Sequence, residues 1–200
     1  MNRMKLLLYA VCFTALVGCS PKYGVGDYYE AEGVRGVVFS VTDGGRHGKI
    51  LSLEETSLPW QTGRGIDVVG AADQDNGAVN LEQVKSQDNW QERFPAFAWC
   101  AGLGEGWYLP AVNEMAEINA SHEAVNAALV AVQGTPLETQ GVTFLYWSST
   151  ETGKYEASGG WLYAKSFKPS DEIKNYSQHV RAVRALPLLY QSGYLTIKKY

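Results

Sequence analysis

The order of the periodic segments constrains the fold of this chain most strongly. Segments with the apolar patterns of β-strands lie near both ends of the sequence, and segments with helical spacing lie between them. An order of strands, then helices, then strands is typical of an α+β domain, in which helices gather on one side of a mainly antiparallel sheet. We therefore expect a small twisted sheet flanked by helices.

The strand patterns differ in clarity. Asp43-Gly44-Gly45 is a strong turn signal and predicts a hairpin between the first two strands. In the last strand, Val180 and Ala182 alternate with Arg181 and Arg184, which indicates one face in solvent. Residues 54–77 have no clear period, and the polar segments 151–160 and 168–178 are predicted to be loops. The predicted strands are residues 36–41, 48–53, 144–149, 161–167 and 179–186.

Four segments in the middle of the chain have helical patterns. They are residues 79–87, part of 90–103, 111–119 and 121–132. Asn80 and Ser121 are predicted to cap the first and last of them. Pro95 limits where the second can begin, and Pro110 sets the entry to the third.

The N-terminus has the pattern of an export signal. Arg3 and Lys5 precede the apolar segment 6–17, which is shorter than the roughly twenty residues of a membrane-spanning helix. We therefore expect residues 1–18 to be removed. Leu16-Val17-Gly18-Cys19 resembles the lipobox of bacterial lipoproteins, in which a peptidase cuts before the cysteine and lipid is added to it. The alternative is an uncleaved anchor in which Cys19 is an ordinary apolar residue.

This resemblance implies a location in the cell envelope. Several acyl chains on Cys19 would anchor the protein durably, because each buried methylene contributes about 0.8 kcal/mol. We expect attachment to the outer membrane, on its periplasmic face or at the cell surface, with membrane contact through the lipid only. Residues 19–32 form a short lipid-anchored tether, residues 33–186 the folded domain, and residues 187–200 a C-terminal extension with an edge-strand pattern at 194–197.

Charge and cysteine content exclude several classes of protein. The formal net charge of −4 argues against nucleic-acid binding, which needs concentrated positive charge. Cys12 leaves with the signal and Cys19 is lipidated, so only Cys100 remains and no intrachain disulfide can form. Its neighbours, Ala96-Phe97-Ala98-Trp99 and Ala101, are apolar, which predicts a buried and inert thiol.

Several sequence blocks carry a resemblance to one family. Gly106-Trp107-Tyr108-Leu109-Pro110 with Glu114-Met115, Tyr146-Trp147-Ser148-Ser149-Thr150, and Val180-Arg181-Ala182-Val183-Arg184 stand in the family order. They resemble the DUF1566 family, which includes the C-terminal domain of a Legionella collagen-like adhesin and a related paralogous domain of Fibrobacter. Weaker blocks are Gly36-Val37-Val38-Phe39 and residues 75–80. Ala111 and Ala182 depart from the family's usual Ser or Thr and Cys.

The resemblance implies a C-type-lectin-like fold. Such a fold has a small twisted sheet, two flanking helices and a long loop region that presents a binding surface. Trp107 and Trp147 lie inside the family blocks, so we expect them to fill the core. Arg181 and Arg184 are expected to make structural hydrogen bonds on the last strand.

No residue pattern indicates catalysis. His47, His122 and His179 have no Ser or Cys partner in a nucleophile motif, and we expect them to be scattered and exposed. Residues 73–77 (Asp-Gln-Asp-Asn-Gly) superficially suggest a calcium loop, but the glycine comes one residue early and Val84 occupies the twelfth position. A turn is the better interpretation. We expect no catalytic residue, no metal and no cofactor, and therefore no enzyme.

A group of aromatic and imidazole side chains borders the two polar segments. They are Tyr155, Trp161, Tyr163, Tyr176 and His179, and we predict that they bind a glycan or an envelope or host protein. The alternative is that they only cover the sheet.

Three classes of function remain after this search. The first is a lipid-anchored binding module, as in adhesion. The second is a structural subunit or tip of a surface or fimbrial assembly, in which residues 187–200 could be a strand offered to a partner. The third, an enzyme of the formylglycine-generating type, shares the broader fold but needs paired cysteines, which Cys100 alone does not supply.

Overall fold

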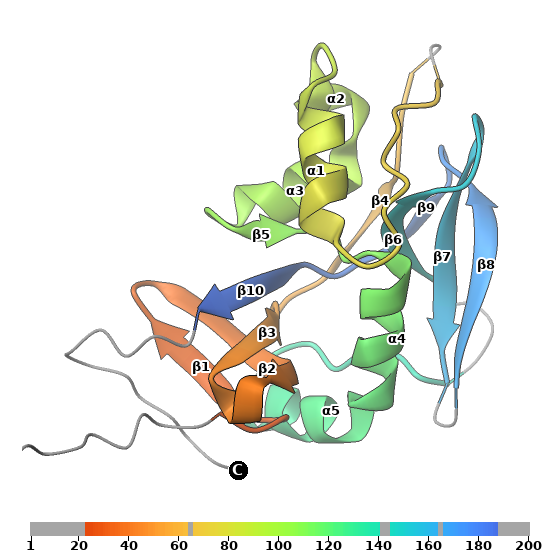
Figure 1. Ribbon diagram of the computed structural model, residues 1–200. Helices are drawn as coiled ribbons and strands as arrows, with labels where there is room; N and C mark the ends of the chain where they lie inside the picture. The colour runs from red at the N-terminus through yellow and green to blue at the C-terminus, as the bar shows by residue number, and fades with distance from the viewer. Residues whose placement is uncertain (1–22, 64–65, 141–144, 164–165, 188–200) are drawn as a thin grey trace, which may run out of the picture.

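The computed structural model describes residues 23–63, 66–140, 145–163 and 166–187. The predictions for the export signal, for lipidation at Cys19 and for an edge strand at 194–197 lie outside these residues. The described chain forms two five-stranded sheets with helices packed between and beside them (Figure 1). The α+β class predicted from the sequence is confirmed. The finer C-type-lectin-like assignment stays a prediction.

The first sheet has the strand order β1-β2-β3-β10-β5, and all its neighbouring strands are antiparallel. The β2–β3 hairpin predicted at residues 43–45 is confirmed, with a short 3-10 helix in its turn. Residues 28–31, which the sequence analysis assigned to the tether, form β1 and pair with β2. The strands are β1 (Tyr28–Ala31), β2 (Val34–Thr42), β3 (His47–Leu51), β5 (Trp107–Tyr108) and β10 (Val183–Pro187).

The second sheet has the order β4-β9-β6-β7-β8, in which only the β6–β9 pair is parallel among the described strands. Its presence corrects the expectation of a single sheet. The predicted strand 179–186 divides into β9 and β10, which belong to different sheets, so the chain crosses between the sheets at Arg181-Ala182. The strands are β4 (Thr56–Pro59), β6 (Leu145–Glu151), β7 (Glu156–Leu162), β8 (Phe167–Ile173) and β9 (Ser177–Val180).

The β7–β8 hairpin overturns three predictions. The segment 161–167, predicted as a strand, instead spans the turn of this hairpin, and most of the polar segments 151–160 and 168–178 is strand. β8 is an edge strand, where charged residues and Pro169 are tolerated because one side of the ladder is unpaired. Gly160 allows close packing, since a Cβ there would lie 2.4 Å from the Phe167 ring.

Five α-helices lie in the described part of the chain. The third and fourth predicted segments became α4 and α5, whereas the second is broken before Pro95 into α2 and α3. The first helix begins two residues earlier than predicted, at Gly77. The helices are α1 (Gly77–Lys85), α2 (Trp90–Arg93), α3 (Pro95–Gly102), α4 (Val112–Ala120) and α5 (His122–Ala131).

The predicted cap of α1 is wrong, and that of α5 is confirmed in position but makes no side-chain capping bond. Asn76, not Asn80, caps α1, because its side chain accepts a hydrogen bond from the Ala78 N–H. Asn80 lies inside the helix, fully buried, and its amide donates to the Asp73 carbonyl and to Ser149. Ser121 stands at the start of α5, but its hydroxyl donates backwards to the last carbonyls of α4 instead of accepting from its own helix.

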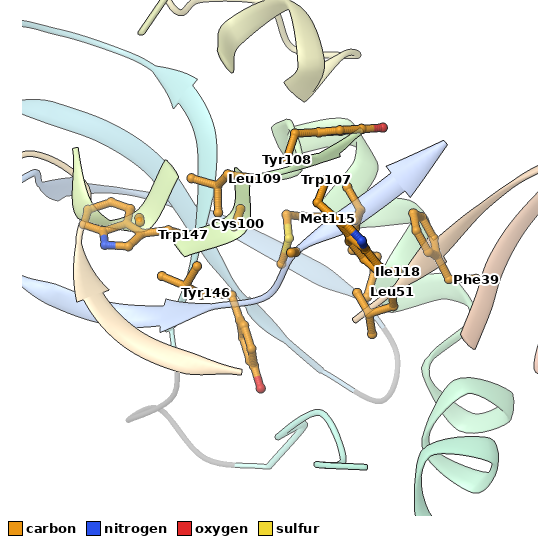
Figure 2. Packing of buried hydrophobic residues seen from close by; sticks show 14 of the residues in the cluster. Phe39, Leu51, Cys100, Trp107, Tyr108, Leu109, Met115, Ile118, Tyr146 and Trp147 are labelled. Atoms are coloured by element: carbon orange, nitrogen blue, oxygen red, sulfur yellow. The ribbon is translucent and has the colours of Figure 1, made fainter. Parts of the chain in front are cut away.

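One hydrophobic core is shared by the two sheets and the helices. Figure 2 shows Trp147 and Tyr146 of β6 in the same cluster as Phe39 and Leu51 of the first sheet. Trp107 and Trp147 are buried, as predicted, and so is the free thiol of Cys100, whose pKa burial raises well above its usual value.

Three polar side chains predicted to be exposed lie in or near this core. His122 is buried and His179 is half-buried, so only His47 fits the expectation of exposed histidines. Arg181 is 1% exposed, which contradicts the prediction that it lies on a wet face. Its predicted role in structural hydrogen bonds is confirmed, because it donates to the carbonyls of Ser52 and Thr135.

Candidate functional site

The five predicted ligand-binding residues do not form one site. β7 separates Tyr155, which precedes it, from Trp161 near its other end and Tyr163 just beyond. Six residues of extended chain span about 20 Å, so Tyr155 and Trp161 lie at opposite ends of the strand. Tyr176 lies in the β8–β9 turn, at the same end as Tyr155, because the Lys174 N–H donates to the Tyr155 carbonyl. His179 lies in β9.

Large apolar side chains are exposed at the end of the second sheet where β7 begins and β8 ends; this end lies at the upper right in Figure 1. We call this exposed surface the tip surface and define it by four side chains from three separate segments. Single exposed apolar side chains are common, whereas several that gather at one place often mark contact with a ligand or partner. The four residues and their exposed fractions are Val68 (65%), Tyr155 (59%), Tyr176 (54%) and Ile173 (41%).

Lys174 joins the three segments beneath this surface. Its side chain is fully buried, and its ammonium donates to the Asp67 carbonyl, the Lys154 carbonyl and the Glu151 carboxylate at 3.2, 3.0 and 2.5 Å. The ammonium also lies 4.8 Å from the centre of the Trp60 ring, a cation–π distance. All three donors of the ammonium are therefore satisfied, and the turns that carry the tip surface are held in fixed positions.

Glu151 supplies the matching negative charge. Its carboxylate accepts hydrogen bonds from the backbone N–H groups of Val69 and Gly70 and from the side-chain ammonium of Lys174. Desolvation lowers the pKa of Lys174, although Glu151 opposes this shift. Because the pair is buried and saturated, it has no free atom for chemistry and acts as a support for the surface above it.

The tip surface combines apolar area with charge. The Lys154 ammonium lies 5.5 Å from the centre of the Tyr155 ring and 3.8 Å from the Asp67 carboxylate. Exposed tyrosine faces can stack on a sugar ring or pack on a protein, and their hydroxyls can donate and accept hydrogen bonds. The arrangement is thus suited to binding.

The other end of the β7–β8 hairpin carries Trp161 and Tyr163. Trp161 is opposite Lys168 in the ladder, and the Lys168 ammonium lies 5.7 Å from the centre of the Trp161 ring. Both aromatic side chains are half-buried. This contact fits the alternative from the sequence analysis, in which these side chains cover the sheet.

His179 takes part in a polar cluster at the edge of the core. Its Nδ1 lies 3.1 Å from one oxygen of Glu55, while Arg181 and the Tyr146 hydroxyl donate to the other oxygen at 2.8 and 3.0 Å. Burial raises the pKa of Glu55, but these partners lower it more, so that it lies below its usual value. The cluster joins β9 to the segment before β4 and has a structural role.

Sequence reasoning missed half of the tip surface. Val68 lies in a stretch without periodicity, and Ile173 lies in a segment predicted to be a loop. Lys174 had no signal of its own, because its partners come from residues about 20 and 107 positions away. The exposure of Tyr155 and Tyr176 between polar neighbours was the one signal that pointed to this place.

Three further features concern metal binding, the turn at residues 73–77 and the length of the helices. No group of three or more His, Cys, Asp or Glu side chains in this part of the chain could hold a metal ion. The Asp73 carboxylate accepts from the N–H groups of Asp75 and Asn76, which confirms the predicted turn at residues 73–77. None of the helices in the described ranges is long and apolar enough to cross a membrane.

Comparison with known proteins gives a likeness in fold. No family model matches the chain, and no curated protein matches it. The fold is similar to that of a fimbrial protein from Bacteroides ovatus, with a TM-score of 0.59 and 18% sequence identity. The match covers 80% of this chain and 48% of the other, so the chain spans about half the length of that protein. At this identity the likeness shows the fold alone.

Proposed function

We propose that this chain is a lipid-anchored binding module of the cell envelope that recognises a glycan or a protein through its tip surface. One observation carries the proposal, namely that four exposed apolar side chains from three segments are gathered above a buried and fully satisfied ion pair. A surface held rigid in this way loses little conformational entropy on binding, which favours affinity.

The location in the envelope rests on the sequence. The pattern of an export signal that ends at Cys19 supports lipid anchoring, and the resemblance to an adhesin-type family supports a role outside the cytoplasm. Cells fed a labelled fatty acid should incorporate the label into the wild-type protein and not into Cys19→Ala. A wild-type protein without label would contradict the lipid anchor.

A glycan array that includes sulfated polysaccharides, with and without calcium, tests the binding function. We expect saturable binding of one class of ligand by the full chain in detergent. The Tyr155→Ser and Tyr176→Ser variants should each weaken it about tenfold or more, because truncated aromatic contacts at the centre of an interface usually carry much of the affinity.

Tyr163→Ser is the matched control for these variants. Tyr163 is also a half-exposed aromatic residue of the same hairpin, but it lies at the opposite end of β7. Its replacement should leave the affinity unchanged. Equal losses in all three variants would place the ligand elsewhere, and a blank array with folded protein would turn attention to protein partners.

A second function is favoured by the structural comparison. The fold shared with a fimbrial protein supports a structural subunit or tip of a surface assembly. A subunit should co-purify with a high-molecular-weight polymer from the envelope, and a binding module should not. Removal of residues 188–200 would then abolish assembly while leaving the tip surface and its ligand binding intact.

A further inference from the structure

β8 has an open edge along the outside of the second sheet. It is the last strand in the order β4-β9-β6-β7-β8, and no described strand pairs with its far side (Figure 1). Four of its seven residues are exposed, which agrees with an edge that no described segment covers; they are Lys168, Pro169, Asp171 and Ile173. An open edge of this kind is a template on which another strand can pair.

The ladder between β7 and β8 shows which backbone groups point away from the sheet. Hydrogen-bonded and non-hydrogen-bonded pairs alternate along an antiparallel ladder. At one end Tyr163 and Ser166 exchange both backbone hydrogen bonds, and at the other end the Lys174 N–H donates to the Tyr155 carbonyl. Alternation inward from both ends means that the even-numbered residues of β8 bond to β7, whereas the odd-numbered residues direct their backbone groups outward. The outward residues are Phe167, Pro169, Asp171 and Ile173.

The sequence of β8 is complementary to itself when two copies run antiparallel. Phe-Lys-Pro-Ser-Asp-Glu-Ile has an apolar residue at each end, a lysine after the first of them and a glutamate before the last. When Ser170 lies opposite the second copy's Ser170, Lys168 faces the second copy's Glu172, and Phe167 faces its Ile173. By symmetry each of these contacts occurs twice. Opposite charges and apolar side chains that face each other across an antiparallel pair stabilise it.

This register also brings the outward backbone groups together. The Asp171 N–H donates to the second copy's Pro169 carbonyl, and the Ile173 N–H donates to its Phe167 carbonyl. The Ile173 carbonyl is already used, because it accepts from the Tyr176 N–H of the following turn. The nearest like charges are the two Asp171 carboxylates, which lie diagonally across the pair and in solvent, where salt screens their repulsion.

Neighbouring registers are less favourable. A slip of two residues in one direction places Pro169 opposite Pro169, so that both central donors are missing. The same slip in the other direction places Asp171 directly opposite Asp171, and a slip of one residue sets outward groups against groups that already bond to β7. Charges and proline usually protect an edge from pairing. On β8 they oppose these slipped registers and are compatible with the one centred on Ser170.

We propose that β8 pairs with β8 of a second copy of this chain, antiparallel and centred on Ser170, so that two five-stranded sheets join at their edges. The partner is another copy because the charges and the proline match those of the same strand reversed. Only Ile173 belongs both to this interface and to the tip surface, so the pairing can fail while the proposed function holds. The Tyr155→Ser variant of the tip surface should dimerise like its parent.

A single engineered thiol tests the pairing in the full chain. In a non-hydrogen-bonded antiparallel pair the two Cα atoms lie about 4.5 Å apart, a distance that a disulfide can bridge. Mild oxidation of a detergent extract should convert Ser170→Cys to a covalent dimer on a non-reducing gel, and a reducing agent should return it to the monomer. The wild type should stay monomeric, because its Cys100 thiol is buried.

Ser177→Cys is the matched control for this variant. Ser177 is an exposed serine of the same sheet, but it lies in β9, away from the open edge. Chance collisions would cross-link it at least as readily as the half-buried Ser170, so we expect a dimer from Ser170→Cys only. Equal cross-linking of the two variants, or no dimer from Ser170→Cys, would overturn the proposal. A disulfide of Ser170→Cys with a different protein in place of the dimer would also overturn it.

Reversal and exchange of two charges test the register. In the Ser170→Cys background, Lys168→Glu sets like charges opposite each other at two places and should lower the dimer fraction at least about tenfold. Addition of Glu172→Lys should restore the dimer. Lys85→Glu makes the same change of net charge on the exposed surface of α1 and should have no effect. Melting followed by circular dichroism shows whether each variant is folded, and a folded double exchange that stays monomeric would contradict the pairing.

Discussion

Lys174 is a buried cation whose three ammonium donors all meet oxygen acceptors contributed by distant parts of the chain. Transfer of a charge from water into a protein interior is costly, and the cost is recovered only when partners and hydrogen bonds are complete. Here the partners belong to the turns that carry Val68 and Tyr155, so a single residue couples the stability of the domain to the shape of its exposed surface.

Replacement of Lys174 by Met should lower the free energy of unfolding by about 3–5 kcal/mol, because it leaves the carboxylate of Glu151 buried without a counter-ion. The exposed Lys154 is the control, and Lys154→Met should change stability by less than about 1 kcal/mol. Urea unfolding followed by tryptophan fluorescence measures both. Equal, small effects in the two variants would show that the ion pair does not support the fold.

Glu55 gives the domain a dependence on pH. Burial raises the pKa of this carboxyl, but the hydrogen bond from His179, the charge of Arg181 and the hydrogen bond from Tyr146 outweigh this effect and bring the pKa below its usual value of 4.5. A carboxyl with a lowered folded-state pKa contributes stability that is complete above the unfolded pKa and is lost as the pH falls below it.

The expected result is a fall in unfolding free energy of the wild type between about pH 5 and pH 3 that is steeper than in Glu55→Gln. The two stability curves should approach each other as the pH decreases, because the wild-type side chain becomes neutral as well. Urea titrations at a series of pH values measure this difference. Parallel curves over the whole range would exclude Glu55 as a source of the acid sensitivity.

At the level of elements, the start of α1 is fixed by close contact with the segment after β5. A Cβ at Gly77 would lie 2.1 Å from the Leu109 carbonyl oxygen and 2.9 Å from the Ala111 nitrogen, both of them backbone atoms. The Gly77 N–H also donates to the buried carboxylate of Glu114, which in addition accepts from Ala111 N–H and from the Tyr108 hydroxyl. The helix therefore cannot move away without breaking this network.

Gly77→Ala should accordingly destabilise the domain by more than about 2 kcal/mol, since backbone must shift in a packed interior. Gly102→Ala is the matched control in α3, where a Cβ would meet nothing within 4 Å. That change should stabilise by about 0.5–1 kcal/mol through helix propensity. Thermal unfolding by circular dichroism distinguishes the two, and a tolerated Gly77→Ala would contradict the described contact.

An element can be predicted from the sequence when its apolar periodicity and its turn residues lie within its own segment. β2, β3, α4 and α5 have periodic patterns and turn residues within their own segments, and all four are predicted. The β7–β8 hairpin is not, because its edge strand is polar and Gly159 and Gly160 imitate a loop. These two glycines allow Tyr146 and Phe167 to pack closely against the backbone, and this contact can be recognised only in the three-dimensional structure.

The tip surface was only half predictable for the same reason. Tyr155 and Tyr176 are aromatic residues between polar neighbours, and this is a local signal. Val68, Ile173 and Lys174 acquire their roles from contacts between segments that are far apart in sequence. Long-range pairing of this kind leaves no pattern in a single sequence.

On the scale of the whole molecule, the crossing between β9 and β10 connects the two sheets. Arg181 stands at this crossing, and its guanidinium donates to the Ser52 carbonyl beside the first sheet, to Glu55 before the second, and to the Thr135 carbonyl after α5. The core also continues from one sheet to the other (Figure 2). Two sheets joined by a shared core and a shared buried cation should behave as a single cooperative unit.

We therefore expect one unfolding transition for the domain, with the same midpoint by far-ultraviolet circular dichroism and by tryptophan fluorescence. Arg181→Met should lower the free energy of unfolding by about 3–5 kcal/mol, because Glu55 loses its buried counter-ion. The midpoint should fall with it. The transition should stay single, since the apolar core still joins the sheets in the variant. Two separate transitions in the wild type would show that the sheets fold independently, and a split that appears only in Arg181→Met would assign their coupling to this one side chain.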